Sequence, residues 1–171
     1  MCWTKISAEY AIPAASEHPQ LRTLYSKITP YMHLLHNGSA PKRILIVEDN
    51  EIDLTLLRDI LVVHGYETLQ TRHGLEAINL ASTDLPDLIL MDIQLPDVSG
   101  LEVTRRLKDD DRSKRIPIIA VTAFAMECHK REALDSGCDA YLSKPITIFG
   151  FLRTVDSFLS LPISSSPALL R

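Results

Sequence analysis

Cysteine is scarce in this sequence, and its few copies are not spaced for a metal site or a disulfide framework. Cys2, Cys128 and Cys138 are the only three, and no two of them form a Cys-x-x-Cys pair. An odd, scattered set argues against a small disulfide-rich secreted protein and against a thiolate zinc centre. We therefore expect free thiols in a reducing, cytoplasmic compartment.

Long apolar runs and an excess of basic charge are also missing. The longest mostly apolar stretch, Ile116 to Met126, contains Pro117, whereas a membrane-spanning helix needs about 20 apolar residues. The net charge is -4, and the basic residues between 105 and 115 are interrupted by aspartates. Such a charge distribution does not attract nucleic acid or anionic lipid. We expect neither nucleic-acid binding nor membrane insertion.

Regular hydrophobic periodicity is missing from both ends of the chain. Residues 1–40 contain three prolines and are expected to form a flexible or partly helical extension. Residues 161–171, with three consecutive serines before a proline, are expected to form a disordered tail. The remaining residues, 41–160, are predicted to form one domain.

Within this domain, short β-branched runs alternate with segments of helical periodicity. Runs such as Ile44 to Val47 are typical of strands buried on both faces of a sheet. Strands are predicted at 44–47, 66–71, 88–91, 118–121 and 140–142, and helices at 54–65, 75–82, 101–108, 127–136 and 149–159. This alternation predicts an α/β fold: a five-stranded parallel, doubly wound (flavodoxin-like) sheet of order 2-1-3-4-5 with five flanking helices.

Four of the five predicted strands lead into a charged or hydroxyl side chain. The first is followed by Glu48 and Asp49, the third by Asp92, the fourth by Thr122 and the fifth by Lys144. In an open parallel sheet, ligands bind outside the carboxyl ends of the strands, where the strand order reverses. The five side chains are therefore predicted to converge on one small area.

Together these side chains support a chemistry that none of them supports alone. Three carboxylates within about 5 Å repel by ~3 kcal/mol per pair at an effective dielectric near 20, so a cation is expected among them. Oxygen ligands suit Mg2+, which usually takes one or two carboxylates and a substrate phosphate. Asp92 would be the nucleophile that forms an aspartyl phosphate, with Lys144 on a phosphate oxygen and Thr122 as a hydroxyl donor.

Each residue also has a simpler structural interpretation. Asp49 or Asn50 alone would suit a helix N-cap, and Asp92 alone would suit a turn. Thr122 alone could bond to the backbone, and Lys144 alone could be a solvated charge. Their joint occurrence, in this order and at successive strand ends, favours the functional interpretation.

Four sequence strings carry a resemblance to a known family. They are ILIVEDN at 44–50, PDLILMDIQLPDVSGLEV at 86–103, PIIAVTAFA at 117–125 and GCDAYLSKPI at 137–146. The chain resembles the receiver domains of two-component response regulators, the CheY-like family. The runs YETLQTRHGLEA and DLILMDIQLP are most similar to single-domain members that regulate cell division.

The resemblance implies a phosphorylation site and a metal site. Asp92 would be the phosphoacceptor. The metal would be held by Asp49 directly, by Glu48 chiefly through water, by Asp92 and by the backbone carbonyl of Gln94. The expected cofactor is Mg2+.

The resemblance also implies a switch. Thr122 would move toward the phosphoryl group, Lys144 would contact it through a loop containing a cis bond to Pro145, and Tyr141 would be the switch aromatic. A histidine kinase or phosphotransfer protein would supply the phosphoryl group, and a downstream protein, such as a kinase, would read the result. Such a regulator is not an enzyme beyond catalysing its own phosphorylation and dephosphorylation. The alternative is a non-phosphorylated scaffold with the same fold.

Three other classes fit the sequence less well. A flavodoxin would place a flavin phosphate against the first loop, where Glu48, Asp49 and Glu51 would repel it. A haloacid-dehalogenase phosphatase needs Asp-x-Asp after the first strand, and a P-loop protein needs G-x-x-x-x-G-K. Neither motif occurs at the required place.

Overall fold

The computed structural model describes residues 40–123 and 127–159, which form alternating strands and helices. In chain order the elements are β1 (Arg43–Val47), α2 (Glu51–Val63), β2 (Glu67–Thr71), α3 (Gly74–Asp84), β3 (Leu88–Met91), α4 (Gly100–Asp109), β4 (Ile118–Thr122), α5 (Glu127–Asp135), β5 (Ala140–Ser143) and α6 (Ile148–Leu159). Each predicted strand and helix is confirmed. The predicted extension and tail lie outside the described residues, apart from Ala40.

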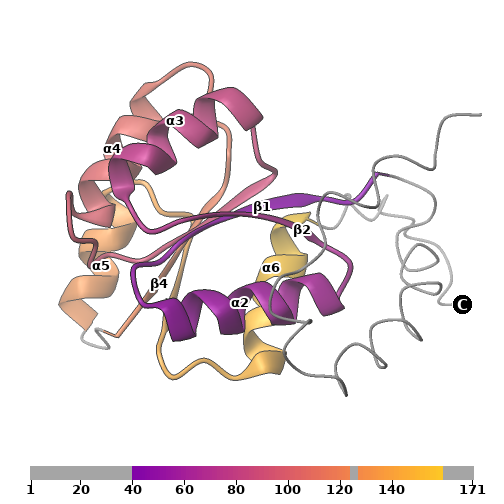
Figure 1. Cartoon of the computed structure of the whole chain (residues 1–171). Helices are drawn as coiled ribbons and strands as arrows, with labels where there is room; N and C mark the ends of the chain where they lie inside the picture. The colour runs from indigo at the N-terminus through magenta and orange to yellow at the C-terminus, as the bar shows by residue number, and fades with distance from the viewer. Residues whose placement is uncertain (1–39, 124–126, 160–171) are drawn as a thin grey trace, which may run out of the picture. The chain divides into compact units, whose positions relative to one another are not determined.

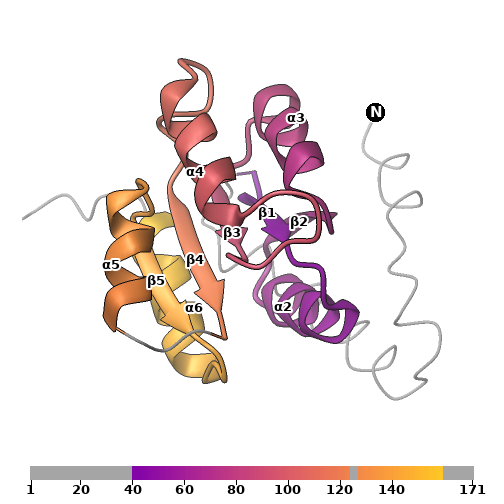
Figure 2. The same ribbon diagram turned by 90° about the vertical axis from the view of Figure 1, so that its left-hand side faces the viewer.

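The five strands form one parallel sheet of order β2-β1-β3-β4-β5, as predicted. The first strand lies inside the sheet: Leu45 pairs with Leu69 of β2 on one side and with Ile89 of β3 on the other. Figure 2 shows β4 and β5 side by side and running in the same direction. The strand order reverses beside β1, which places the carboxyl ends of β1 and β3 next to each other.

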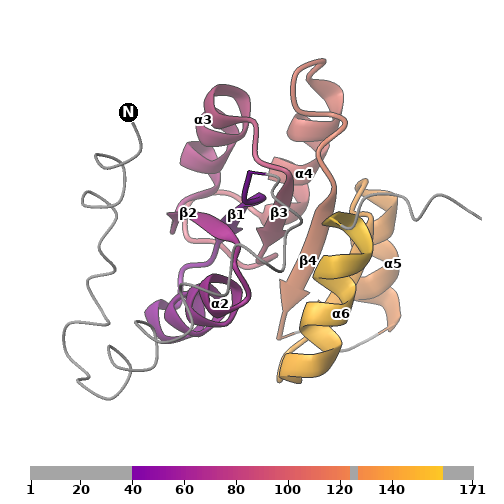
Figure 3. The ribbon, with the colours of Figure 1, turned by 90° about the vertical axis from the view of Figure 1, so that its right-hand side faces the viewer.

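Helices cover both faces of the sheet. One core cluster joins Leu45 and Val47 of β1 to buried residues of α3, α4 and α5. The other joins Ile44 and Ile46 of the same strand to buried residues of α2 and α6. The two groups of helices accordingly lie on opposite sides of the strands (Figure 1 and Figure 3). Burial on both faces explains why the central strands are continuous apolar runs.

The helices that follow β1 and β3 begin close to the ends of these strands. The Asn50 side chain accepts hydrogen bonds from the backbone N–H groups of Ile52 and Asp53, at 2.9 and 3.2 Å, so Asn50 is the N-cap of α2. Gly100 begins α4 and packs directly against the end of β3. A Cβ at this position would lie 2.0 Å from the carbonyl oxygen of Asp92, so the close approach requires glycine. Both helices therefore start beside the carboxyl ends of the central strands.

The described helices differ from membrane-spanning helices in length or in apolar character. None of those in residues 40–123 and 127–159 combines the length with the apolar character that a bilayer-spanning helix requires.

Candidate functional site

Three acidic side chains meet at the carboxyl end of the sheet. Glu48 and Asp49 follow β1, Asp92 follows β3, and one carboxylate oxygen from each lies within 4.8 Å of the others. Glu48 and Asp92 are buried, at 1% and 6% exposure, and Asp49 is half-buried. The structure thus brings together the three carboxylates that the strand ends indicated.

Lys144 reaches this acidic cluster from the loop after β5. Its Nζ atom donates to Glu48 Oε2 at 2.7 Å, to Asp53 Oδ2 at 2.8 Å and to Asp92 Oδ2 at 3.0 Å. Burial alone would lower the pKa of Lys144, but the bonds to the three carboxylates outweigh it and raise the pKa. The lysine is therefore a permanent cation within the cluster.

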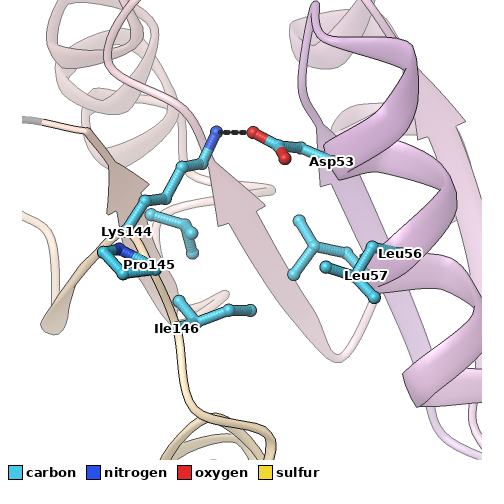
Figure 4. Close-up of a pocket in the computed structure, with 7 residues that line it drawn as sticks. Asp53, Leu56, Leu57, Lys144, Pro145 and Ile146 are labelled. Atoms are coloured by element: carbon cyan, nitrogen blue, oxygen red, sulfur yellow. Dashed lines mark hydrogen bonds and ion pairs between the residues drawn. The ribbon is translucent and has the colours of Figure 1, made fainter.

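Asp53 is a member of the site that the sequence did not predict. It lies in the first turn of α2, three residues after the Asn50 cap, and Figure 4 shows its carboxylate facing Lys144. An acidic residue at that position is normally explained by the helix dipole alone. The sequence carries no signal for this contact, because the Asn50 cap, which sets the residues of the first turn that face the strand ends, is established only by the structure.

Both carboxylate oxygens of Asp92 accept hydrogen bonds. Its Oδ1 atom accepts from the backbone N–H of Gln94 at 2.9 Å, and its Oδ2 atom accepts from Lys144. The first bond is the turn that a lone aspartate would form. The role of the Gln94 carbonyl as a metal ligand stays a prediction.

Thr122 and Tyr141 occupy the neighbouring strands β4 and β5. Thr122 is completely buried at the end of β4, where its carbonyl accepts from the backbone N–H of Lys144 at 2.8 Å. Tyr141 is half-buried and packs against the core cluster beneath α3, α4 and α5. The peptide bond from Lys144 to Pro145 is cis, as the resemblance implied. The switch roles of Thr122 and Tyr141 stay predictions.

A pocket of about 390 Å³ opens beside the acidic cluster, between α2 and the loop after β5. It is lined by Asp53, Leu56, Leu57, Val121, Lys144, Pro145 and Ile146 (Figure 4). One wall is apolar, and Leu56 is 47% exposed. The charged cluster is thus reachable across an apolar surface.

The donor set at the cluster fits a magnesium ion. Glu48, Asp49 and Asp92 offer hard oxygen atoms, which are the ligands that Mg2+ prefers, and no sulfur or imidazole ligand belongs to the group. Their mutual repulsion would be relieved by a divalent cation.

Burial changes the protonation of Glu48. Burial, together with the charge of Asp92, raises the pKa of Glu48 to about 7 against the opposing effect of Lys144. Because the folded pKa is above the ordinary value of 4.5, the folded protein holds a proton that the unfolded chain releases. Stability in the absence of metal should therefore fall as the pH rises from about 4.5 to 7.

Glu48→Gln should remove this part of the pH dependence. We expect the free energies of unfolding of the variant and the wild type to diverge by on the order of 1–2 kcal/mol across that window, with the variant favoured at the higher pH. Urea unfolding in EDTA at a series of pH values measures the difference. Parallel curves for the two proteins would show that Glu48 titrates normally.

Comparisons with known proteins show what this chain is similar to. Residues 44–155 match the family described as the response regulator receiver domain. The polar-differentiation response regulator DivK of Brucella anthropi is 57% identical over 119 residues, which are 70% of this chain and 97% of that protein. DivK of Brucella abortus is 56% identical over 118 residues, 69% of this chain and 96% of that protein.

Solved structures show the same similarity. The receiver domain of a sensor histidine kinase from Pseudomonas aeruginosa, with a magnesium ion coordinated in its active-site cleft, is 33% identical with a TM-score of 0.66. The aligned part is 70% of this chain and 98% of that domain. The phosphorylated cyanobacterial phytochrome response regulator RcpA is 30% identical with a TM-score of 0.62, over 70% of this chain and 94% of that one.

Proposed function

The chain belongs to the response regulator receiver domain family, and on that basis we propose that Asp92 accepts a phosphoryl group beside a bound Mg2+ ion. Receiver domains are phosphorylation switches rather than enzymes with a separate substrate. The observation that carries the proposal is the cluster itself: three carboxylates within 4.8 Å, with Lys144 bonded to Glu48 and Asp92. That combination suits a divalent ion and a phosphate together.

The proposed reaction is a displacement at phosphorus by Asp92. A carboxylate oxygen of Asp92 forms the new P–O bond, and the bond to the nitrogen of the donor histidine breaks, leaving its electron pair on that nitrogen. Mg2+, when held by Glu48, Asp49, Asp92 and the Gln94 carbonyl, would neutralise charge on the transferring group. Lys144 would exchange its bond to Asp92 Oδ2 for one to a phosphoryl oxygen.

The proposed switch transmits this event along β4 and β5. Thr122 and Lys144 can both bond phosphoryl oxygens only if the loops after these two strands draw inward. Tyr141 would turn with them and change the face formed by α5, β5 and α6. Phe149, which is 76% exposed, lies on that face and would contact a partner. A coupling of ~1–3 kcal/mol would change the partner's affinity five- to 150-fold.

The proposed partners follow from the family and from the relatives. A histidine kinase or phosphotransfer protein would supply the phosphoryl group across the apolar wall beside Lys144. The DivK relatives are polar-differentiation response regulators, so we propose that this protein also acts in cell-division or cell-cycle signalling, read by another protein such as a kinase. The free thiols of Cys128 and Cys138 favour the cytoplasm as the place of action.

Removal of Mg2+ tests the proposal. Incubation with radiolabelled acetyl phosphate should label the wild-type protein in the presence of Mg2+, and EDTA should slow the labelling about 100-fold, because the charge on the transferring group loses its main stabilisation. Addition of excess Mg2+ should restore the rate. Hydroxylamine should release the label, as expected of an acyl phosphate. Equal labelling with and without EDTA would contradict the metal-assisted reaction.

A further inference from the structure

Residues 71–76 span the end of β2 and the first turn of α3. They include no predicted metal ligand, but they are hydrogen-bonded to the two loops that carry the predicted ligands. We call this segment the β2–α3 bridge. On one side it contacts the loop after β1, which bears Glu48 and Asp49. On the other side it contacts the loop after β3, which bears Asp92 and Gln94.

The contact with the first loop consists of three hydrogen bonds. The backbone N–H of Glu48 donates to the carbonyl of Thr71 at 3.1 Å. The guanidinium of Arg72 donates from Nε and Nη2 to the carbonyl oxygen of Asp49, at 3.0 and 2.7 Å. Because the two N–H groups of the planar guanidinium have a fixed geometry, together they restrict the position of the carbonyl oxygen more than a single donor would. Arg72 thereby fixes the backbone of a residue that offers its carboxylate to the cluster.

The contact with the second loop is made by Asp97. Its Oδ1 atom accepts from the backbone N–H of Gly74 and its Oδ2 atom from that of Leu75, each at 2.9 Å. The local N-cap of α3, His73, makes no capping bond with its own side chain, so Asp97 fills that role from a distant loop. A Cβ on Gly74 would lie 2.7 Å from Val98 Cγ1, which shows how closely the two segments pack.

Hydrogen bonds also connect the residues of the bridge to one another. The Thr71 hydroxyl is buried, donates to Glu76 Oε2 at 2.5 Å and accepts from the backbone N–H of His73 at 3.1 Å. These bonds connect the end of β2 to the first turn of α3. A displacement of the bridge on the side of Arg72 is therefore passed to the side of Asp97.

We propose that the β2–α3 bridge positions the two metal-bearing loops relative to each other, with Arg72 and Asp97 as its positioning residues. The proposal rests on the proposed function, because it assumes that Mg2+ binds at Glu48, Asp49 and Asp92. Neither positioning residue has a side-chain contact with the three carboxylates among the bonds described. Their effect on the ion is exerted through the backbone.

Because Arg72 is positively charged, the direction of the change in Mg2+ affinity on its removal tests the proposal. A cation near a metal site opposes metal binding by Coulomb repulsion, so its removal should tighten Mg2+ binding if charge alone matters. If Arg72 instead holds the Asp49 backbone in place, its removal should weaken Mg2+ binding. The two explanations predict opposite changes in one dissociation constant.

Isothermal titration calorimetry with MgCl2 on the full chain measures that constant. Arg72→Gln is expected to weaken Mg2+ binding about 10-fold, which is the lower end of the loss seen when groups supporting metal ligands are removed. Arg72→Lys keeps the charge but loses the fork, and we expect it to weaken binding as well, by roughly threefold. Arg131→Gln is the matched control, because Arg131 is exposed on α5 and its ion pair is with Asp135; its dissociation constant should equal that of the wild type.

A second variant keeps the test independent of Arg72. Asp97→Asn retains one acceptor for the N–H groups of α3 and should also weaken Mg2+ binding. The double variant with Arg72→Gln should weaken Mg2+ binding by less than the product of the two single fold-changes, because both residues act through the same bridge. Thermal unfolding in EDTA checks that each variant is folded. Unchanged or tighter Mg2+ binding by folded Arg72→Gln would overturn the bridge proposal alone. A wild-type protein that binds no Mg2+ would overturn the proposed function and the bridge with it.

Discussion

Asp92→Asn is expected to abolish phosphoryl incorporation completely. The amide is uncharged and is not a nucleophile that can form the mixed anhydride of an aspartyl phosphate. The substitution also removes one of the three carboxylates at the cluster, so the proposed Mg2+ site is weakened at the same time. The fold should survive, because the backbone of residue 92 and the packing of Gly100 against it are unchanged.

The measurement is label from acetyl phosphate or from a phosphorylated histidine kinase, confirmed by intact-mass spectrometry. Asp111→Asn is the matched control, since it makes the same chemical change at an exposed aspartate that pairs with Lys114. The control should be labelled at the wild-type rate. Labelling of Asp92→Asn at that rate would place the acceptor elsewhere. A wild type that accepts no label from any donor would instead favour the scaffold alternative.

The fold was predictable because each of its determinants is local or follows from a general rule. The buried run Ile44 to Val47 shows strand character by composition, and the helices show their 3.6-residue periodicity. Right-handed crossovers between parallel strands then leave few sheet orders, and the observed order is the one predicted. Once the order is known, the residues that follow each strand must share one edge of the sheet.

The contacts that complete the site were not predictable in the same way. Asp53 meets Lys144 across 91 residues of sequence, and Asp97 meets Gly74 across 23. Nothing in the local sequence distinguishes these aspartates from other acidic residues in a first helical turn or a surface loop. Arg72 is exposed and donates to the backbone carbonyl of Asp49. Every residue has such a carbonyl, so the type of the accepting residue does not reveal the contact. Such pairings depend on loop geometry rather than on composition.

One choice left open by the sequence is decided by local geometry. Asp49 and Asn50 were equally suitable as the N-cap of α2, and Asn50 takes that position. The carboxylate of Asp49 is consequently free of the capping role and lies with the acidic cluster. Lys144 shows a related difference, because the sequence indicated only a phosphate contact. In the structure it also neutralises part of the charge of Glu48, Asp53 and Asp92.

That second role predicts a large loss of stability for Lys144→Met. Methionine keeps much of the volume of the lysine stem but leaves Glu48 and Asp92 buried without their cation. Breaking a buried ion pair by removing one partner costs about 3 kcal/mol or more, and Lys144 is only 18% exposed. We expect a decrease of about 3 kcal/mol in the free energy of unfolding at pH 8 without metal.

The pH dependence of this loss identifies its cause. Without Lys144 the folded-state pKa of Glu48 must rise further, so the folded variant takes up a proton that the unfolded chain does not. The penalty should accordingly shrink as the pH falls from 8 toward 5, and saturating Mg2+ at pH 8 should recover part of it. Urea unfolding at both pH values, with Lys114→Met as the surface control, measures these differences. A penalty that is independent of pH would mean that lost packing, rather than unpaired carboxylates, destabilises the variant.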